Sequence, residues 1–426
     1  MAAHETIFSM DTSSIKFGPG STSEVGYEMR RLGARRVLVV TDPSLADSQA
    51  VATTVKAIRS EGIDVVIFDN ARVEPTDASF KEAIAVAVDG EFDGYVAVGG
   101  GSAMDTAKAA NLYATYPADF LTYVNPPIGD GAPVPGPLKP LIAIPTTAGT
   151  GSETTGVAIF DYTELHAKTG IAHRSLRPAL GIVDPENTRT LPPLAAACSG
   201  FDVLCHAIES ITAIPYNSRD AADSPALRPS YQGSNPISDI LSGGIAPDVR
   251  CEHRPGRRAS RRRCGPEPDD ARRHLCRHRV RQRGLSSPAW HVLSGFRHGP
   301  RLLAGGIQRR SPADPARHVS HPERAGRLPM DRRSQPGAPS LGGGTTRRGY
   351  SGVDPKDAGE ILANAIIELM RKVDMPNGLA AVGFEADDIP ALVEGTMPQH
   401  RVTKLSPCPA GPDDLSEIFR NAMRYW

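Results

Sequence analysis

The chain has 426 residues, and its 48 basic residues balance its 48 acidic residues, so its formal net charge is zero. This length is enough for two domains of ordinary size. The N-terminus has the layout of neither a signal peptide nor a transit peptide, and we expect no apolar run long enough to span a bilayer. Six cysteines without paired spacing argue against a disulfide framework. We therefore expect a cytoplasmic protein with no membrane partner, or a mitochondrial one if the source is eukaryotic.

The charge balance is a cancellation between two unlike parts of the chain. Residues 242–349 hold 24 Arg, no Lys and 8 acidic residues, a net charge of +16 (24 minus 8). The other 318 residues carry 24 basic and 40 acidic residues, a net charge of −16 (24 minus 40). Because a uniform globular domain does not segregate charge in this way, the basic segment is expected to follow different rules from the rest.

Strands and helices alternate in the first part of the chain. Apolar runs predict strands at residues 36–42, 64–69, 94–98 and 141–144, with helices ending near 61 and beginning near 77 and 102. Nearly all-apolar strands interleaved with helices indicate a parallel sheet that is covered on both faces. Such sheets bind ligands at the carboxyl ends of their strands. The turns that follow the strands are therefore the candidate site.

Three of these turns carry polar or glycine-rich sequences. Asp42 ends the first strand, where its carboxylate could bind a ribose diol, although a cap or turn role explains a lone Asp as well. GGGSAMDTAK follows the third strand, and Ser102 is expected to cap the helix that begins there. A glycine turn at a helix N-terminus is an anion site or a plain tight turn. PTTAGTGSE follows the fourth strand, and two such turns on one edge predict a dinucleotide site.

A second set of polar residues lies in residues 200–209, whose apolar spacing predicts a helix. Asp202 and His206 are four residues apart, so they project from one helical face and could bind one metal ion. A simple ion pair is the alternative explanation. A metal site would need at least one further ligand from elsewhere in the chain.

Taken together, GGGSAMDTAK, PTTAGTGSE and GFDVLCHAIES resemble the iron-containing, group III alcohol dehydrogenases. More narrowly, the chain resembles their hydroxyacid-oxoacid transhydrogenase branch, over residues 1 to about 241 and again from about 350 to the C-terminus. The resemblance implies a dehydroquinate synthase-like architecture. An α/β Rossmann-like domain would span residues 1–195 and an all-helical, metal-binding domain 196–426, with cofactor and metal between them.

The resemblance also implies roles for individual residues. Asp202 and His206 would be two of four ligands of Fe²⁺, with Zn²⁺ as the other candidate, but the two His-Gly-Met-type motifs that supply the family's other ligands are absent. Arg174 and Arg177 are candidates for binding substrate carboxylates, or are ordinary surface charges. The implied cofactor residues are Asp42 and Lys168 for ribose, Gly100, Gly101 and Ser102 for the pyrophosphate, and Thr146, Thr147 and Thr150 for the rest of the cofactor.

The implied activity is a transhydrogenation through bound NAD(H). A small hydroxy acid such as 4-hydroxybutyrate would become its semialdehyde, and a 2-oxo acid, 2-oxoglutarate, would become 2-hydroxyglutarate. A plain NAD-dependent iron-containing alcohol dehydrogenase that acts on simple alcohols is the alternative within the family. A homodimer is expected, and no nucleic-acid partner.

The composition of the basic segment is better explained by a shifted reading frame in the gene than by a function of the segment. Only 16 of the 108 residues in 242–349 are large apolar or aromatic, too few to bury a core. A nucleic-acid-binding insert is the alternative, but the segment has no Lys and no aromatic interleaving. Codons for residues 272–298, read from their second base, permit a peptide that resembles a missing metal motif. We therefore predict that 242–349 is out of frame and that this sequence is inactive. We assign no ligand role to four of the segment's histidines, which are His291, His298, His318 and His321.

Overall fold

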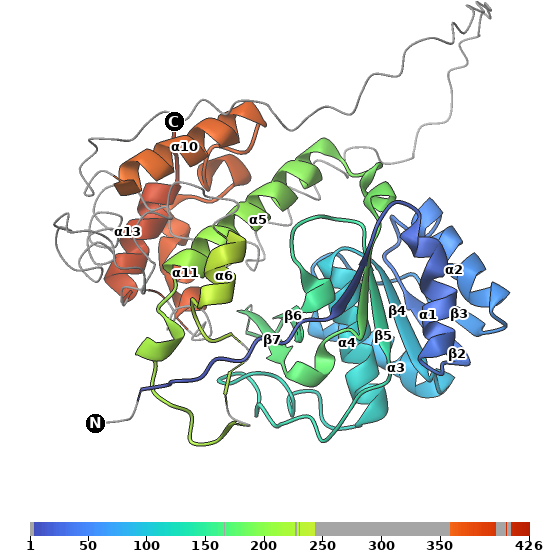
Figure 1. Cartoon of the computed structure of the whole chain (residues 1–426). Coiled ribbons are helices and arrows are strands. Elements are labelled where there is room, and N and C mark those ends of the chain that lie inside the picture. Colours follow the sequence, from blue (N-terminus) through green and yellow to red (C-terminus); the bar gives the residue numbers. More distant parts are fainter. Residues whose placement is uncertain are drawn as a thin grey trace, which may run out of the picture.

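The computed structural model describes residues 4–165, 167–225, 228–229, 231–242, 358–397, 406 and 410–426. Within these residues an α/β part precedes a group of helices, as the sequence predicted (Figure 1). The expectations about the Arg-rich segment and about the four histidines named in it fall outside the described residues, apart from Ser242, which ends a helix.

Six strands form one sheet in the order β1-β8-β5-β4-β2-β3, and each pairing in it is parallel. The four expected strands are confirmed as β2 to β5. Two further strands extend the sheet, and an antiparallel pair, β6–β7, lies beside it; the sequence did not predict these four. The strands are β1 Ser14–Phe17, β2 Arg36–Val40, β3 Asp64–Phe68, β4 Gly94–Gly99, β5 Leu141–Pro145, β6 Val157–Tyr162, β7 Ala167–Ala172 and β8 Leu180–Val183.

Helices cover both faces of the sheet, which confirms the expected architecture. Val37 and Val39 of β2 pack in the core cluster formed with α1 Val25–Arg31 and α2 Gln49–Ser60. Leu38 and Val40 point to the other face and pack with α3 Asp77–Gly90 and α4 Gly101–Thr115. All four of these side chains are fully buried. A strand that is apolar at successive positions therefore satisfies two separate cores.

The order of the strands creates a switch point between β2 and β4. The chain leaves β2 through α2 to reach β3 on one side, and then returns through α3 to β4 on the other side of β2. As a result, α2 and α4 lie on opposite faces of the sheet. In open α/β sheets, ligands bind at such a point, outside the carboxyl ends of the strands.

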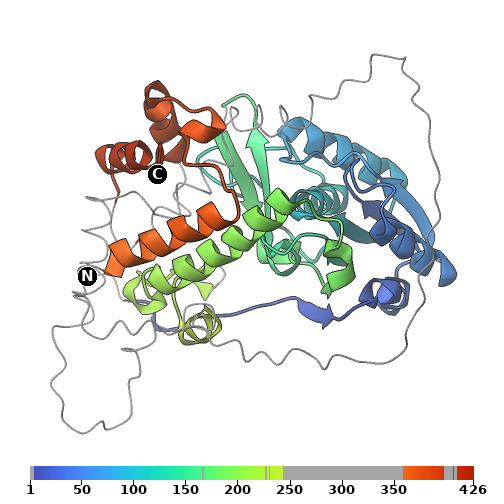
Figure 2. The same ribbon diagram turned by 90° about the horizontal axis from the view of Figure 1, so that it is seen from above.

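The remaining helices gather to one side of the sheet, and α5 extends from them toward it (Figure 2). Helices α11 and α13 share a small apolar core that includes Leu392 and Phe419. These helices are α5 Pro193–Thr212, α6 Pro236–Ser242, α10 Ala358–Lys372, α11 Ile389–Thr396 and α13 Pro412–Ala422.

Helix α5 is long and apolar enough to cross a membrane, which differs from the expectation that no run in the chain is. It is the one helix within the described residues to pass that test. Length and composition alone are a weak indication, since a helix of a globular core passes the same test. The carboxylates of Asp202 and Glu209 lie on this helix, and carboxylates are costly in hydrocarbon.

Helices α1 and α2 approach each other closely at Gly26. A Cβ atom added there would lie 2.0 Å from the carbonyl oxygen of Ala57, so Gly26→Ala must push the helices apart. We expect the substitution to lower the free energy of unfolding by about 1–3 kcal/mol in urea denaturation. Gly200→Ala in α5 is the matched control, because nothing lies within 4 Å of its added Cβ and alanine favours a helix interior. Equal effects of the two substitutions would contradict the packing described.

Candidate functional site

Asp42 and the glycine turn after β4 lie together at the switch point. Asp42 Oδ1 accepts a hydrogen bond from Ser44 N at 2.9 Å and a second one from the Ser44 hydroxyl. A Cβ atom added to Gly99 would lie 3.6 Å from Asp42 Oδ2. One carboxylate oxygen therefore closes a local turn, while the other lies beside the glycine turn. Asp42 is buried, at 5% exposure.

The N-terminus of α4 has no capping side chain. Gly100 is the N-cap residue, and the helix begins at Gly101. The expectation that Ser102 caps this helix is wrong, because Ser102 lies within the first turn, where its carbonyl accepts a hydrogen bond from Thr106 Oγ1 at 2.8 Å. A first turn that no side chain caps leaves its N–H groups available to an anion.

The loop after β5 packs against the same glycine turn. Thr146 N donates a hydrogen bond to the carbonyl of the last β4 residue at 3.0 Å. A Cβ atom added to Gly100 would lie 3.7 Å from Thr147 Cγ2, and one added to Gly101 would lie 3.1 Å from Thr150 Oγ1. The structure thus brings together the glycines and the three threonines that the sequence singled out.

Helix α5 meets this loop at Gly149. A Cβ atom added to Gly149 would lie 3.1 Å from Ser199 Cα and 3.3 Å from Asp202 Oδ2. A larger residue at this position would have to displace the helix. The absence of a side chain at Gly149 therefore allows Asp202 of α5 to lie beside the threonine-rich loop.

Asp202 and His206 form a pair on one face of α5, as their spacing predicted. The distance from Asp202 Oδ1 to His206 Nε2 is 3.8 Å. Within the described parts of the chain, no group of three or more His, Cys, Asp or Glu residues has an arrangement that could hold a metal. These parts therefore offer two candidate ligands, whereas a closed metal site would need four.

Lys168 lies on β7, directly across from Asp161 of β6, with 4.0 Å between Nζ and Oδ1. Asp161 also forms a bridge to Thr76, the N-cap residue of α3, so this end of the hairpin lies toward the carboxyl edge of the sheet. Burial raises the pKa of Asp161 and of neighbouring Glu74, and the charge of Lys168 opposes both shifts. Lys168 is therefore a cation set among acidic groups near the switch-point edge.

Arg174 and Arg177 lie elsewhere. Each has a guanidinium nitrogen 3.6 Å from Asp11 Oδ2. Asp11 and Arg177 precede the parallel neighbours β1 and β8 by three residues each, at the edge where these strands begin. The structure does not bring these arginines to the carboxyl edge with the other candidates, because both precede β8 and therefore lie at the edge where that strand begins.

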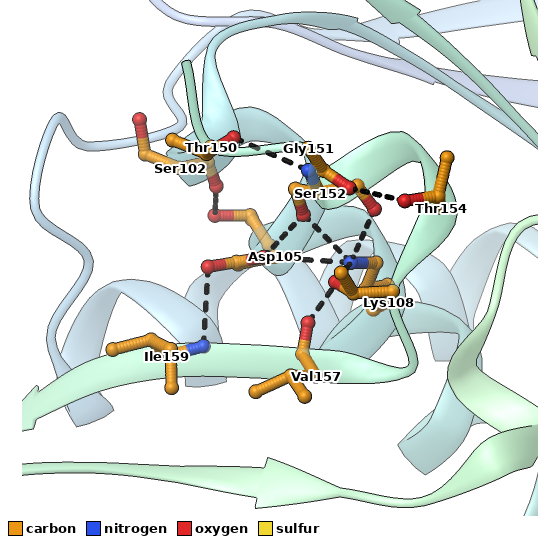
Figure 3. Close-up of polar contacts among 11 residues, drawn as sticks. Ser102, Asp105, Lys108, Thr150, Gly151, Ser152, Thr154, Val157 and Ile159 are labelled. Carbon is orange, nitrogen blue, oxygen red and sulfur yellow. Dashed lines mark hydrogen bonds and ion pairs between the residues drawn. The ribbon is translucent and has the colours of Figure 1, made fainter. Parts of the chain in front are cut away.

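Three polar residues next to the site were not assigned a role from the sequence. Asp105 and Lys108 of α4 contact Ser152 of the loop after β5 in one buried network (Figure 3). Asp105 and Lys108 stand in GGGSAMDTAK at a helical spacing of three, which was the available signal. Their burial depends on Ser152 and β6, which are distant in sequence, so the motif alone did not reveal it.

Comparisons with known proteins agree with this arrangement. A family model described as "Iron-containing alcohol dehydrogenase" matches residues 12–185. The chain is 43% identical to "Hydroxyacid-oxoacid transhydrogenase, mitochondrial" of Xenopus laevis, over 98% of this chain and 91% of that protein. It is also 43% identical to the human protein of that name, over 98% of this chain and 90% of that protein.

Solved structures share the fold at lower identity. A crystal structure of 1,3-propanediol oxidoreductase has a TM-score of 0.64 at 21% identity, covering 98% of this chain and 100% of the other. Sulfoacetaldehyde reductase from Bifidobacterium kashiwanohense, solved in complex with NAD⁺, has a TM-score of 0.62 at 21% identity, covering 98% of this chain and 99% of the other.

Proposed function

Because this chain belongs to the iron-containing alcohol dehydrogenase family, in its hydroxyacid-oxoacid transhydrogenase branch, we propose that it transfers hydride between a hydroxy acid and a 2-oxo acid through NAD(H). One observation carries the proposal. Asp42, the uncapped N-terminus of α4 and the threonine-rich loop meet at the switch point, and Gly149 of that loop contacts the α5 segment that bears Asp202.

Each cofactor contact in this proposal rests on the chemistry of the residue. Asp42 Oδ2 would accept a hydrogen bond from a ribose hydroxyl, because Oδ1 is already used by Ser44. The N–H groups of Gly101 and Ser102 in the first turn of α4 would hold the pyrophosphate, with Gly100 allowing close approach. The side chains of Thr146, Thr147 and Thr150 would line the cofactor, and Lys168 would reach the second ribose. When bound, NAD(H) supplies the acceptor and donor of hydride.

A buried carboxylate beside a ribose site should favour NADH over NADPH, since it would repel a 2′-phosphate. We expect Asp42→Gly to weaken NADH binding about 10-fold or more, the loss of a hydrogen bond to a charged group, and to narrow the preference for NADH. Calorimetric titration of the full chain with each dinucleotide measures both. Asp47→Asn, an exposed residue of the same loop, is the control and should leave both affinities unchanged. An unaltered NADH to NADPH ratio in Asp42→Gly would refute the ribose contact.

The substrates are proposed to be small carboxylates. In the oxidative half, 4-hydroxybutyrate gives up a hydride and a proton and becomes succinate semialdehyde. In the reductive half, 2-oxoglutarate gains a hydride and a proton and becomes 2-hydroxyglutarate, so the cofactor returns to its starting state. Arg174 and Arg177 are not retained as carboxylate ligands, because both lie with Asp11 at the far edge of the sheet.

The described residues do not fit a complete iron site. Asp202 and His206 are a suitable pair of ligands, but no third ligand joins them within these residues. Residues 242–349, where the family's remaining histidines would be encoded, have the Arg-rich composition of an out-of-frame segment. We therefore propose that this sequence retains cofactor binding and lacks metal-dependent hydride transfer, and that reading the segment in the alternative frame restores the metal site. We also propose that the chain divides into a Rossmann-like domain, residues 1–195, and a helical, metal-binding domain, residues 196–426.

Expressing both versions tests this proposal. The protein expressed with the printed sequence should contain almost no iron by elemental analysis. It should also show no transhydrogenation without added cofactor. The version with residues 242–349 in the alternative frame should bind iron and be active, and His206→Ala in that version should abolish both properties. Iron-dependent activity of the sequence as given would contradict the proposal. Turnover that requires added NAD and a simple alcohol would instead indicate an ordinary alcohol dehydrogenase.

A homodimer is proposed to form through β1. This edge strand pairs with β8 on one side, and its side chains Ile15 and Phe17 share one face at 49% and 71% exposure. An edge strand with exposed apolar residues is a template for pairing with a second copy.

We also propose a cytoplasmic location; the names of the eukaryotic relatives include "mitochondrial".

Light scattering coupled to size-exclusion chromatography tests the dimer. The chain should elute at twice its 45.3 kDa mass, and Phe17→Glu should yield monomers because a charge would be placed in the interface. Ile67→Glu, which changes an exposed apolar residue on the opposite edge strand β3, is the control and should leave the dimer intact. A monomeric parent chain, or a dimer that survives Phe17→Glu, would rule out this interface.

A further inference from the structure

The ammonium group of Lys108 is fully buried and has three close oxygen partners. Its Nζ donates hydrogen bonds to Ser152 Oγ at 2.7 Å, Ser152 O at 2.8 Å and Val157 O at 2.9 Å (Figure 3). Thr155 Oγ1 lies farther away, at 3.4 Å. An ammonium has three N–H groups, so the three short contacts use all of them.

Asp105 completes the network on the other side of Ser152. The Ser152 hydroxyl donates to Asp105 Oδ1 at 2.9 Å, and Ile159 N donates to Asp105 Oδ2 at 3.1 Å. The Lys108 ammonium lies 3.7 Å from Asp105 Oδ1. The three short contacts of Nζ match a protonated Lys108, and Asp105 serves as the acceptor at the other end of the network.

The network joins three segments that each carry candidate cofactor residues. Helix α4 begins with the glycine turn. The 3-10 helix η2, Ser152–Thr154, begins two residues after Thr150, whose Oγ1 accepts a hydrogen bond from Ser152 N at 3.2 Å. Strand β6 holds Val157 and is paired with β7, which bears Lys168. One buried cation therefore sets the spacing between the proposed pyrophosphate site, the threonine loop and the proposed ribose lysine.

We propose that Lys108 is a positioning residue for the dinucleotide: its ammonium, through Ser152 and Asp105, holds the first turn of α4, the threonine loop and the β6–β7 hairpin in the arrangement that binds NAD(H). This inference rests on the proposed function. Lys108 itself touches no cofactor, and it acts through the residues that do.

A role in stability alone is a poor explanation for this network. Burying a charged pair costs desolvation free energy, and well-packed apolar residues of similar volume are often as stabilising or more so. Such a network can still specify a single arrangement of the segments that it joins. Lys108 contacts or joins all three segments that carry candidate cofactor residues. A single arrangement of these segments would favour binding of the dinucleotide.

The pKa of Lys108 lies in a range where its protonation state can be changed by pH and its effect measured. Burial lowers the pKa of Lys108 to about 8, opposed by the carboxylates of Asp105 on α4 and Glu153 on η2. Burial also raises the pKa of Asp105, opposed by Lys108 and by its two hydrogen-bond donors. Because Lys108 loses its proton as the pH rises through about 8, the amine then has two N–H groups for three oxygens. One link between the segments must break.

The experiment is calorimetric titration of the full chain with NADH between pH 6.5 and 9.5. We expect the affinity of the parent chain to fall about 10-fold as the pH rises above 8. Lys108→Met, which keeps the length of the side chain and removes its charge, should bind NADH at least 10-fold more weakly at pH 7 and show no such alkaline fall. Lys56→Met, at an exposed position on α2, is the control and should behave like the parent chain.

Circular dichroism and thermal melting separate positioning from stability. If Lys108→Met melts earlier but binds NADH with the parent affinity below its melting temperature, the inference is overturned. If that variant does not fold, Ser152→Ala removes the link to Asp105 while keeping Lys108, and parent-like affinity and pH dependence in Ser152→Ala would overturn it equally. A parent chain that does not bind NADH at all would overturn the proposed function and this inference together.

Discussion

The parallel pairing of β2 with β4 is the constraint on which the candidate site depends. Val40 is paired with Ala97, so the register continued by two residues sets Asp42 against Gly99. Strand β4 is also paired with β5, where Gly99 lies opposite Pro145, the residue before the threonine loop. A slip of one residue would turn the apolar side chains of β2 to the wrong cores and would separate these turns. The same packing that stabilises the sheet thus assembles the site.

Local patterns in the sequence predicted the central strands, the covered sheet and the turns at its edge. The strand predictions succeed because a doubly buried strand must be apolar throughout, and the turns are found because they directly follow those strands. The prediction for Ser102 failed because Gly100, two residues earlier, already forms the N-cap. Of the two explanations for Arg174 and Arg177, carboxylate binding fails because both residues precede β8, a strand that was not predicted, and pair with Asp11, more than 160 residues away in sequence. Long-range pairing of this kind leaves no local signal.

The candidate site has two halves in different states. The cofactor half is built wholly from described residues of the sheet and from α4, with short contacts between its turns. The proposed metal half has one helix and two candidate ligands within those residues. The neutral total charge conceals a similar division, because the acidic part of the chain contains the cofactor half, and the basic charge is concentrated in the Arg-rich segment 242–349.

The contact at Gly149 has a thermodynamic consequence. Because the threonine loop and α5 touch there with no side chain between them, a ligand that orders the loop also biases the position of Asp202. Coupling of this kind is reciprocal. If the dinucleotide strengthens the binding of a ligand at α5, that ligand strengthens the binding of the dinucleotide by the same free energy. A metal ion at Asp202 and a dinucleotide at the threonine loop would therefore bind cooperatively through this contact.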